Sequence, residues 1–407
     1  MGLKIGVVGT GFAGSFIPLF QAHPLVEEVA VAELVPEKLQ KTAERFGIKR
    51  TYSSLDELCK SDVDAIALFT NRHLHGPHTL QALRAGKHVY CAVPMASSIE
   101  DMQAIIELVD QSDLIYMTGE TSYYYPATIY CRDRFAQGDF GNIVYGEAAY
   151  LHDMSHGFYD AYKHSDGANW KKAAGLPPMF YPTHSVSMIL GVTGAHATQV
   201  SCLGYKDTEG DGVFEAGANY WDNEFSNQTA LLRTSDGGMM RINEFRRVGW
   251  SCRGERSVHM SLFGTKGTFE EQFNATAWTS LKWGEIEDLT DILTCQTVEV
   301  GDAHQQLHEL IQRDYYSGVA KVHPVHRLPE TFKGLHNGHA GSHQFLVDDF
   351  VKSVSQHRLP PNNAWQAARY CIPGLIAHES SLRGGEMLTI PDFGSPSAKW
   401  TLLENND

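Results

Sequence analysis

Residues 4–14 read KIGVVGTGFAG, an apolar run of strand length that ends in a glycine turn, and an apolar, helix-like segment follows over residues 15–22. Gly9, Gly11 and Gly14 fit the G-x-G-x-x-G fingerprint of a dinucleotide-binding βαβ unit. The first glycine permits the tight turn, the second lets the backbone approach a pyrophosphate, and the third lets the helix pack close to the strand. The alternatives for such a motif are a mononucleotide site or an empty α/β turn. We predict a dinucleotide, because the motif follows a strand and opens a helix.

An acidic residue stands at the distance that this fingerprint requires. Glu33 lies nineteen residues after Gly14, at the end of the strand-like run 29–32. A carboxylate at this place accepts hydrogen bonds from the adenosine ribose hydroxyls and repels a 2′-phosphate. The sequence therefore favours NAD over NADP.

Length and composition narrow the class of protein. The 407 residues predict two domains, and a hydrophobic content of 43% with 20% charged residues is typical of a soluble globular chain. The net charge of −15 argues against nucleic acid or an anionic membrane as the main partner. No apolar run reaches spanning length, and the first strand begins almost at once, so neither a membrane span nor a secretory signal is expected.

Cysteine and histidine usage gives two further expectations. The seven cysteines are scattered and never at C-x-x-C spacing, which predicts reduced thiols in a cytoplasmic protein. His336, His339 and His343 are close in sequence. We interpret them as part of a polar loop, and we predict no metal site.

Strand and helix patterns alternate over the first 120 residues, which indicates a doubly wound parallel sheet. The buried strand at 63–69 ends in the polar run Thr70 to His75, and polar residues at the carboxyl end of a parallel strand border the ligand crevice. Ser54 and Ser98 are suitable helix N-caps. The patterns predict helices over residues 39–46, 54–59, 77–85 and 99–111, and strands near 50–52 and over 88–90 and 114–118.

Strand patterns dominate after residue 142, and they predict an α+β domain with a large, mainly antiparallel open sheet. We divide the chain into a Rossmann domain over residues 1–122 and a substrate and oligomerisation domain over 123–407. The C-terminal helix is expected to pack back near the first domain, and residues 285–333 to run over the surface. The predicted strands cover residues 143–151, 197–204, 226–234, 238–244 and 257–264, and the closing helices cover 342–356 and 364–382.

The first domain resembles the Gfo/Idh/MocA superfamily of sugar oxidoreductases. The glycine motif, the run 70–75, the segment AGKHV at 85–89 and the pair Val93-Pro94 carry this resemblance. It implies NAD at the carboxyl ends of the strands, a sugar on the second sheet, and a homodimer or homotetramer formed through that sheet. The predicted cofactor-binding residues are Gly9, Thr10, Gly11, Phe12, Ala13, Glu33, Thr70, Asn71, His75, Val93, Pro94 and Glu120.

One departure from the superfamily bears on the chemistry. Typical dehydrogenases of the superfamily have Glu-Lys-Pro where this chain has Ala92-Val93-Pro94, and their lysine assists proton transfer. Valine can neither donate nor accept a proton. The chain is similar instead to the branch of NAD-dependent glycoside hydrolases that includes bacterial α-N-acetylgalactosaminidase. Ala92 and Ser185 differ from that branch, and the features that match it are Val93-Pro94, Glu120, the segment Tyr150-x-His152-Asp153 and the segment Tyr181-Pro-Thr-His184.

The resemblance implies a glycosidase that uses transient oxidation: oxidation at C3, loss of the C2 proton with departure of the C1 group, addition of water and re-reduction. Such enzymes need no carboxylate pair. We assign His184 to the hydroxyl being oxidised and Tyr150 to the C2 proton or the leaving group, with Tyr181, His152 and Glu120 as further catalytic candidates. A sugar or polyol dehydrogenase, or a keto-sugar lyase lacking the lysine, is the alternative, and a non-catalytic NAD or sugar sensor is the third.

Structural roles are the competing interpretation for several of these residues. Tyr150 alone fits a half-buried sheet position, His184 a helix cap or core histidine, and Glu120 a salt-bridged strand end. Arg246 and Arg247 fit either a solvated strand end or a site for a carboxylated or sulfated sugar. Core packing is the favoured interpretation for the remaining aromatic candidates, which are Tyr123, Tyr124, Tyr125, Trp170, Trp250, Trp278 and Trp283.

Overall fold

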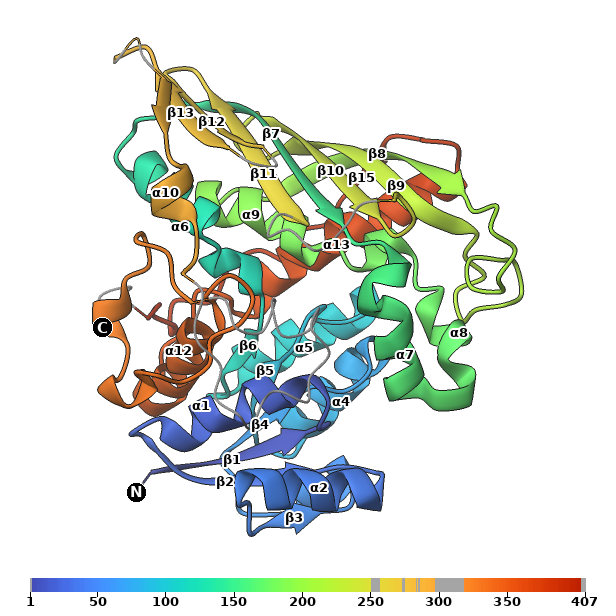
Figure 1. The fold of residues 1–407 in the computed structure, drawn as a ribbon, viewed down its shortest axis with the longest axis vertical. Coiled ribbons are helices and arrows are strands. Elements are labelled where there is room, and N and C mark those ends of the chain that lie inside the picture. Colours follow the sequence, from blue (N-terminus) through green and yellow to red (C-terminus); the bar gives the residue numbers. More distant parts are fainter. Residues whose placement is uncertain are drawn as a thin grey trace.

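The computed structural model describes residues 2–249, 257–272, 275–282, 284, 286–296 and 318–403. Figure 1 shows two sheets, a smaller one near the N-terminus and a larger one at the opposite end, with helices between them. Trp250, Trp283 and the middle of the predicted surface excursion at 285–333 lie outside the described residues.

The first sheet is parallel throughout, as the alternating pattern predicts. Its described strands lie in the order β3-β2-β1-β4-β5-β6, with β1 in the centre between β2 and β4. The central strands are apolar and fully covered on both faces, which is usual for parallel sheets. The strands are β1 (Leu3–Val8), β2 (Val26–Ala32), β3 (Thr51–Tyr52), β4 (Ala65–Leu68), β5 (His88–Cys91) and β6 (Tyr116–Thr118).

Local sequence signals set the ends of the helices around this sheet. Ser54 and Ser98 are N-caps as predicted, and each Oγ accepts a hydrogen bond from the amide three residues later, at 3.3 and 3.2 Å. The first helix begins two residues later than predicted, because the glycine turn continues into a single 3-10 turn, Phe12–Ser15. The second begins three residues earlier, at Pro36, whose fixed φ suits a first helical turn. The helices are α1 (Ile17–Ala22), α2 (Pro36–Phe46), α3 (Leu55–Cys59), α4 (His75–Arg84) and α5 (Ile99–Gln111).

The second sheet is mainly antiparallel, with one parallel pair. Its described strands lie in the order β14-β13-β12-β11-β7-β10-β9-β8-β15, and β7 pairs with β10 in parallel. A helical crossover follows β7, and the next strand, β8, runs parallel to β7. Strand β9 then pairs antiparallel with β8, and β10 pairs antiparallel with β9, so that β10 lies beside β7 and parallel to it. The strands are β7 (Ile143–Leu151), β8 (Ala197–Lys206), β9 (Phe225–Thr234), β10 (Met239–Phe245), β11 (Val258–Gly264), β12 (Gly267–Glu271), β13 (Thr276–Ser280), β14 (Ile286–Asp288) and β15 (Leu388–Thr389).

The helices of the second half cover the side of this sheet that faces the first domain (Figure 1). Almost every residue of the crossover helix α9 is buried, because the helix lies between the two sheets. The helices are α6 (Pro126–Ala136), α7 (Tyr159–Asp166), α8 (Trp170–Ala174), α9 (Thr183–Thr193), α10 (Thr290–Leu293), α12 (His343–Gln356) and α13 (Ala364–Leu382).

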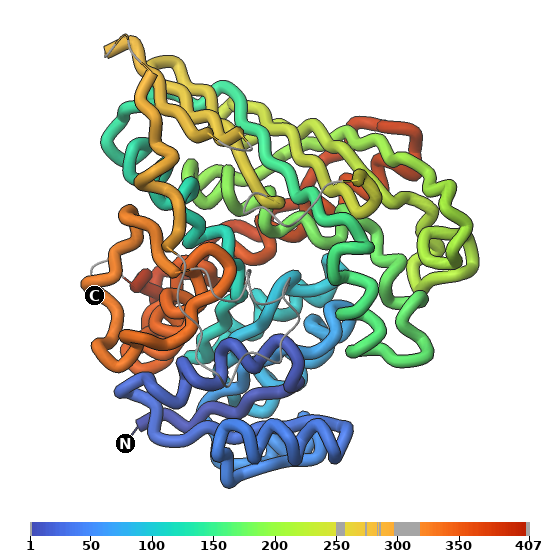
Figure 2. The backbone as a smooth tube through the Cα atoms, in the orientation of Figure 1, coloured from blue at the N-terminus to red at the C-terminus, as the bar shows by residue number. Residues whose placement is uncertain are grey.

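The closing segment returns to the first domain, as Figure 2 shows for its orange and red parts. Helix α12 packs on α1, with the rings of Phe20 and Phe350 6.5 Å apart and His23 Nε2 3.3 Å from Asp348 Oδ1. Asn362 Nδ2 donates to the carbonyl of Glu120 at 3.3 Å, so the residues before α13 support the end of β6. The domain division at residue 122 stays a prediction.

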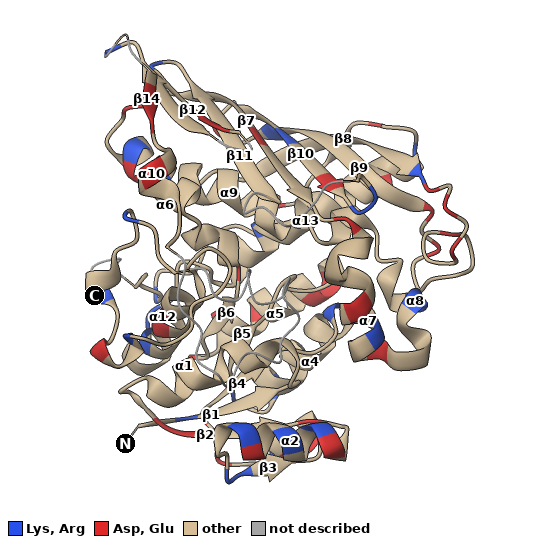
Figure 3. Ribbon diagram, viewed as in Figure 1, with Lys and Arg blue, Asp and Glu red and all other residues tan. Residues whose placement is uncertain are grey.

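Charged side chains gather on outer elements such as α2 and α7 in Figure 3, and the two sheets carry few of them. None of the described helices combines the length and the apolar character that crossing a membrane requires.

Candidate active site

The glycine turn has the geometry that a dinucleotide needs. Gly9 has φ +84°, and a Cβ there would lie 2.6 Å from the carbonyl oxygen of Phe69. A Cβ on Gly11 would meet nothing within 4 Å, so the space in front of the second glycine is open. Glu33 lies beside the turn as predicted: its Oε2 accepts hydrogen bonds from Thr10 N at 3.2 Å and Thr10 Oγ1 at 2.9 Å. The residues present therefore fit a bound dinucleotide.

The loops after β4 and β5 are tied together by His75. Its ring nitrogens lie 2.7 Å from the carbonyl oxygen of Pro94 and 2.9 Å from that of Thr70. Burial lowers the pKa of His75 to about 4. The neutral ring donates a hydrogen bond to one of these carbonyls and packs against the other, so His75 positions the two loops. Asn71 Nδ2 donates to Asp166 Oδ1 at 2.7 Å, which ties the same loop to the end of α7.

Glu120 and His184 form a buried pair at the carboxyl end of β6. Nδ1 of His184 donates to Oε1 of Glu120 at 2.6 Å, and the amide and hydroxyl of Ser122 donate to the same oxygen at 2.9 Å. Burial by itself would raise the pKa of Glu120, but His184 and the Ser122 amide outweigh it and lower the pKa. The carboxylate thus fixes the ring tautomer and leaves Nε2 of His184 to exchange a proton.

Two tyrosines pack edge-on against this histidine. The ring centroids of Tyr150 and Tyr181 lie 5.4 and 5.3 Å from that of His184, and 6.1 Å from each other. Burial raises the pKa of both phenols, although Arg72 opposes this at Tyr181 and Arg246 opposes it at Tyr150. In the protein alone both tyrosines are therefore protonated near neutral pH and act first as hydrogen-bond donors.

His152 completes the group. Its ring stacks on Phe158 with centroids 3.8 Å apart, and lies 5.4 Å from the ring of Tyr150. Desolvation by the surrounding side chains, followed by the nearby charge of Arg246, lowers its pKa to about 3, so the ring is neutral. The structure thus brings all five catalytic candidates together, and we name Glu120, Tyr150, His152, Tyr181 and His184 the His184 cluster.

Sequence reasoning missed Glu244, which lies beside this cluster. It is fully buried, accepts from Ser185 Oγ, and accepts from Arg246 Nη2 at 2.8 Å. Burial raises the pKa of Glu244 to about 7, although Arg246 and Ser185 act in the opposite direction. Glu244 belongs to the site because it lies opposite Tyr150 where β10 pairs with β7 in parallel. The sequence does not reveal which strands pair, so it gives no sign of this neighbour.

The interpretation of Arg246 as a solvated strand end is wrong. Its side chain is buried, and its guanidinium lies 4.8 Å from the ring centroid of Tyr150, because the fold places the end of β10 against the site. Arg247 is also paired, at 3.1 Å to Asp207 and 2.8 Å to Asp211.

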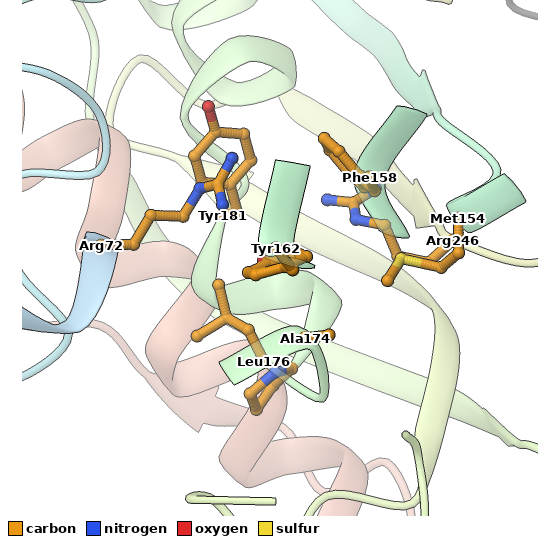
Figure 4. A pocket seen from close by; sticks show the side chains of 9 residues that line it. Arg72, Met154, Phe158, Tyr162, Ala174, Leu176, Tyr181 and Arg246 are labelled. Atoms are coloured by element: carbon orange, nitrogen blue, oxygen red, sulfur yellow. The ribbon is translucent and has the colours of Figure 1, made fainter. Parts of the chain in front are cut away.

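Arg72 is a second residue that sequence reasoning left out of the site, although it stands in the predicted loop after β4. Its guanidinium lies 4.7 Å from the ring centroid of Tyr181 and 5.3 Å from that of Tyr162. It borders a small pocket of about 10 Å³, room for about one water molecule or one oxygen of a larger group (Figure 4). The pocket is lined by Arg72, Met154, Phe158, Tyr162, Ala174, Leu176, Pro177, Tyr181 and Arg246.

Of the three clustered histidines, His336 and His339 lie in the loop before α12 as expected, whereas for His343 that expectation is wrong. His343 begins α12 and is fully buried, and its Nε2 lies 3.0 Å from Nδ1 of His339. Their rings lie 5.8 and 5.5 Å from Phe12 of the glycine turn, because α12 packs over this turn. In the part of the chain that the structure describes, no group of three or more His, Cys, Asp or Glu side chains is arranged to hold a metal.

The remaining candidates have simpler places. Val93 and Pro94 are buried within the loop after β5, and Ala13 is buried in the first core. Trp278, Tyr123 and Tyr124 are buried core residues, which agrees with their packing interpretation, whereas Trp170 is half-buried beside Tyr159.

Comparisons with known proteins agree with this geometry. A family model described as "Oxidoreductase family, NAD-binding Rossmann fold" matches residues 3–120. Residues 3–120 form a Gfo/Idh/MocA family domain. This Gfo/Idh/MocA domain contains the glycine turn, Glu33, both loops and Glu120, and its family binds NAD.

Several relatives extend beyond this domain. A glycosyl hydrolase family 109 protein of Streptomyces filamentosus is 22% identical and covers 96% of this chain and 77% of its own length. An alpha-N-acetylgalactosaminidase of Shewanella oneidensis is 27% identical over 37% of this chain and 36% of its own.

Among solved structures, a levoglucosan dehydrogenase in complex with NADH superposes with a TM-score of 0.70 at 17% identity. The match covers 97% of this chain and 100% of the dehydrogenase chain, so both sheets share one fold with it.

Proposed function

We propose that this protein is an NAD-dependent glycosidase that cleaves its substrate by transient oxidation. The observation that carries the proposal is the His184 cluster: a histidine held by a buried carboxylate, with two tyrosines against its ring and Val93 in place of a lysine. In the described part of the chain, the hydrogen bonds and ion pairs of the cluster involve no lysine. A relative named as a glycosyl hydrolase of family 109 that spans 96% of this chain supports the same assignment.

The residues for the cofactor meet at one edge of the first sheet. The turn from Gly9 to Ala13 would hold the pyrophosphate and Glu33 the adenosine ribose. Thr70, Asn71, Val93, Pro94 and Glu120 would border the nicotinamide end. NAD, when bound, supplies the reversible oxidation and re-reduction of one sugar carbon.

Proton movements then fall to the His184 cluster. Nε2 of His184 takes the proton of the hydroxyl being oxidised and later returns it, and the Glu120 carboxylate 2.6 Å from Nδ1 stabilises the charged ring. Oxidation of the sugar carbon acidifies the neighbouring C–H bond. Tyr181 accepts that proton as a phenolate, after its phenol proton has passed to solvent, and Arg72 stabilises this phenolate.

Tyr150 has the complementary task. Its phenol is protonated in the protein alone, so it can donate a proton to the leaving-group oxygen as the C1 bond breaks. Arg246 lies 4.8 Å from its ring centroid and stabilises the phenolate that forms. Water then adds, Tyr150 recovers its proton, and the neutral His152 ring lines this side of the site.

The test is an assay with NAD and nitrophenyl glycosides of both anomers, in which aglycone release and NADH absorbance are followed together. We expect aglycone release without net NADH, and deuterium at C2 when the reaction runs in heavy water. His184→Gln should abolish release, whereas the exposed His164→Gln serves as the matched control and should not. Full turnover of His184→Gln would refute the assigned role.

A sugar or polyol dehydrogenase is the second candidate. The pair of His184 and Glu120 supplies a base without a lysine, and the levoglucosan dehydrogenase fold spans the whole chain. Net formation of NADH in proportion to the sugar added would favour this candidate. If neither aglycone release nor NADH is detected while NAD stays bound, a sensor would be favoured.

The proposal includes a cytoplasmic homodimer or homotetramer formed through the second sheet. Leu203 on β8, Leu231 on β9 and Met239 on β10 are 65%, 55% and 56% exposed, so apolar surface is present on these strands. Light scattering during size-exclusion chromatography measures the assembly, and a monomer at micromolar concentration would contradict it.

A further inference from the structure

We infer that the pocket beside the His184 cluster binds a singly charged oxyanion of the substrate, a carboxylate or a sulfate ester, through Arg72. The inference rests on the proposed function, because it names the substrate class of the same site: an acidic sugar.

The first observation is the environment of Arg72. It stands in the short turn Arg72–Leu74 after β4, and its guanidinium lies 4.7, 5.3 and 5.7 Å from the ring centroids of Tyr181, Tyr162 and Phe158. Within the described ranges of the chain no carboxylate lies at ion-pairing distance from it. Aromatic faces offset part of the lost hydration of a cation, and the Tyr181 hydroxyl is a hydrogen-bond partner of the guanidinium, but neither supplies a negative charge. An oxyanion would supply it, through two parallel N–H···O bonds.

The second observation is that the other cation of the pocket is already neutralised. Arg246 reaches in from the side opposite Arg72 in Figure 4, but its Nη2 is bonded to the Glu244 carboxylate at 2.8 Å. While Tyr181 is protonated, the charge of Arg72 thus has no carboxylate partner among the described residues, and one negative charge balances it. A phosphate monoester, which carries close to two charges near neutral pH, matches this pocket less well.

The third observation is the wall of the pocket between the two arginines. Met154, Ala174, Leu176 and Pro177 are apolar, so they lower the local dielectric and strengthen an ion pair with Arg72. A neutral hydroxyl at the same place would leave the guanidinium without its charge partner.

The position of the pocket relates it to the reacting sugar. Tyr181 lines the pocket and also contacts His184, with ring centroids 5.3 Å apart, and Arg246 lines the pocket and lies over Tyr150. The anionic group thus belongs to the reacting sugar or to the unit next to it. The bond from Asn71 to Asp166 fixes the loop of Arg72 against α7, so the guanidinium is positioned before substrate arrives.

The test measures binding, which does not depend on turnover. The NAD-loaded protein is titrated by calorimetry with galacturonate and glucuronate, with galactose 6-sulfate and glucose 6-sulfate, and with the neutral sugars and the 6-phosphates. We expect at least one carboxylated or sulfated sugar to bind ten-fold or more tightly than its neutral counterpart. Arg72→Gln should remove this preference.

Two further variants make the result specific. Arg45→Gln is the matched control, because Arg45 also lies over an aromatic ring, Phe46, but is exposed on α2. It should bind as the wild type does. Arg72→Lys keeps the charge without the planar pair of donors, so part of the preference should remain. Thermal melting and NAD titration of each variant show whether it is folded and holds the cofactor.

Equal affinity for acidic and neutral sugars, an unchanged preference in Arg72→Gln, or tightest binding of the phosphates would overturn the inference. The two proposals fail separately. Acidic sugars that bind through Arg72 but are never cleaved would contradict the glycosidase alone, whereas cleavage confined to neutral glycosides would contradict the inference alone.

Discussion

Lowering the pH from 7.5 to 5 is expected to reduce the free energy of unfolding, and three buried histidines that stay neutral in the folded protein account for about 6 kcal/mol of the loss. His75, His323 and His378 are 1%, 5% and 6% exposed, and burial lowers the pKa of each from 6.5 to about 4. Their nitrogens are engaged with the protein: those of His323, for example, lie 2.9 Å from Tyr124 O and from Ala320 N.

The sign follows from the proton balance. The unfolded chain takes up protons near pH 6.5 and the folded chain only near pH 4, so this stability is present above pH 6.5 and is lost as the pH falls. One pKa unit corresponds to about 1.36 kcal/mol, and pH 5 lies one and a half units below 6.5, so each histidine contributes about 2 kcal/mol.

Other groups titrate in the same range. Glu244, with a pKa of about 7 when folded, gains a proton as the pH falls and offsets about 3 kcal/mol of the loss. The pKa values of His88, His152 and His339 are lowered to about 4, 3 and 3, so these less buried rings act with the first three and outweigh Glu244. The contribution of the first three histidines alone is a large part of the 5–15 kcal/mol of a typical folded protein, so a marked loss of stability is expected at pH 5.

The assay is urea unfolding followed by circular dichroism at pH 7.5, 6.5, 5.5 and 5. His378→Gln removes one of the three buried histidines, at a position outside the His184 cluster. The variant should lose about 2 kcal/mol less of its free energy of unfolding between pH 7.5 and 5 than the wild type does. His164→Gln is the control, because that side chain is exposed in the folded protein. Equal stability at pH 7.5 and 5, or an unchanged pH dependence in His378→Gln, would refute the reasoning.

Three further predictions concern the site. Glu120→Gln keeps an acceptor for Ser122 but removes the charge beside His184, and should lower turnover about 10²-fold or more with NAD binding retained; a wild-type rate would exclude the assigned role. Glu244→Gln replaces the titrating carboxyl by a neutral amide. The free energy of unfolding of the wild type minus that of the variant should therefore fall by about 3 kcal/mol as the pH rises from 4.5 to 7, and a difference that does not change with pH would contradict the raised pKa. Gly9→Ala should lower stability by about 1–3 kcal/mol because of its positive φ and the Phe69 carbonyl, whereas Gly11→Ala should melt as the wild type does but bind NAD more weakly in a fluorescence titration; the opposite pattern would contradict the geometry of the turn.

The sequence by itself determined the first domain. The glycine turn, the serine caps of α3 and α5 and the apolar strands depend on contacts within a few residues, so each signal is readable where it stands. The errors in this domain are shifts of two or three residues at the ends of elements, as at α1 and α2, where a 3-10 turn and a proline changed the first helical turn.

The members of the His184 cluster followed from a family resemblance, but their arrangement depended on tertiary structure. Glu120 and His184 are 64 residues apart and meet because α9 crosses beneath the second sheet. Glu244 lies beside Tyr150 only through the parallel pairing of β10 with β7, and His343 reaches the glycine turn only because α12 packs over it. The environment of Arg72 depends on both halves of the chain, since its loop follows β4 and its aromatic partners lie between β7 and β8. Such contacts join residues far apart in the chain, and the burial that shifts the pKa values of this site arises only when the two sheets and their helices have packed together.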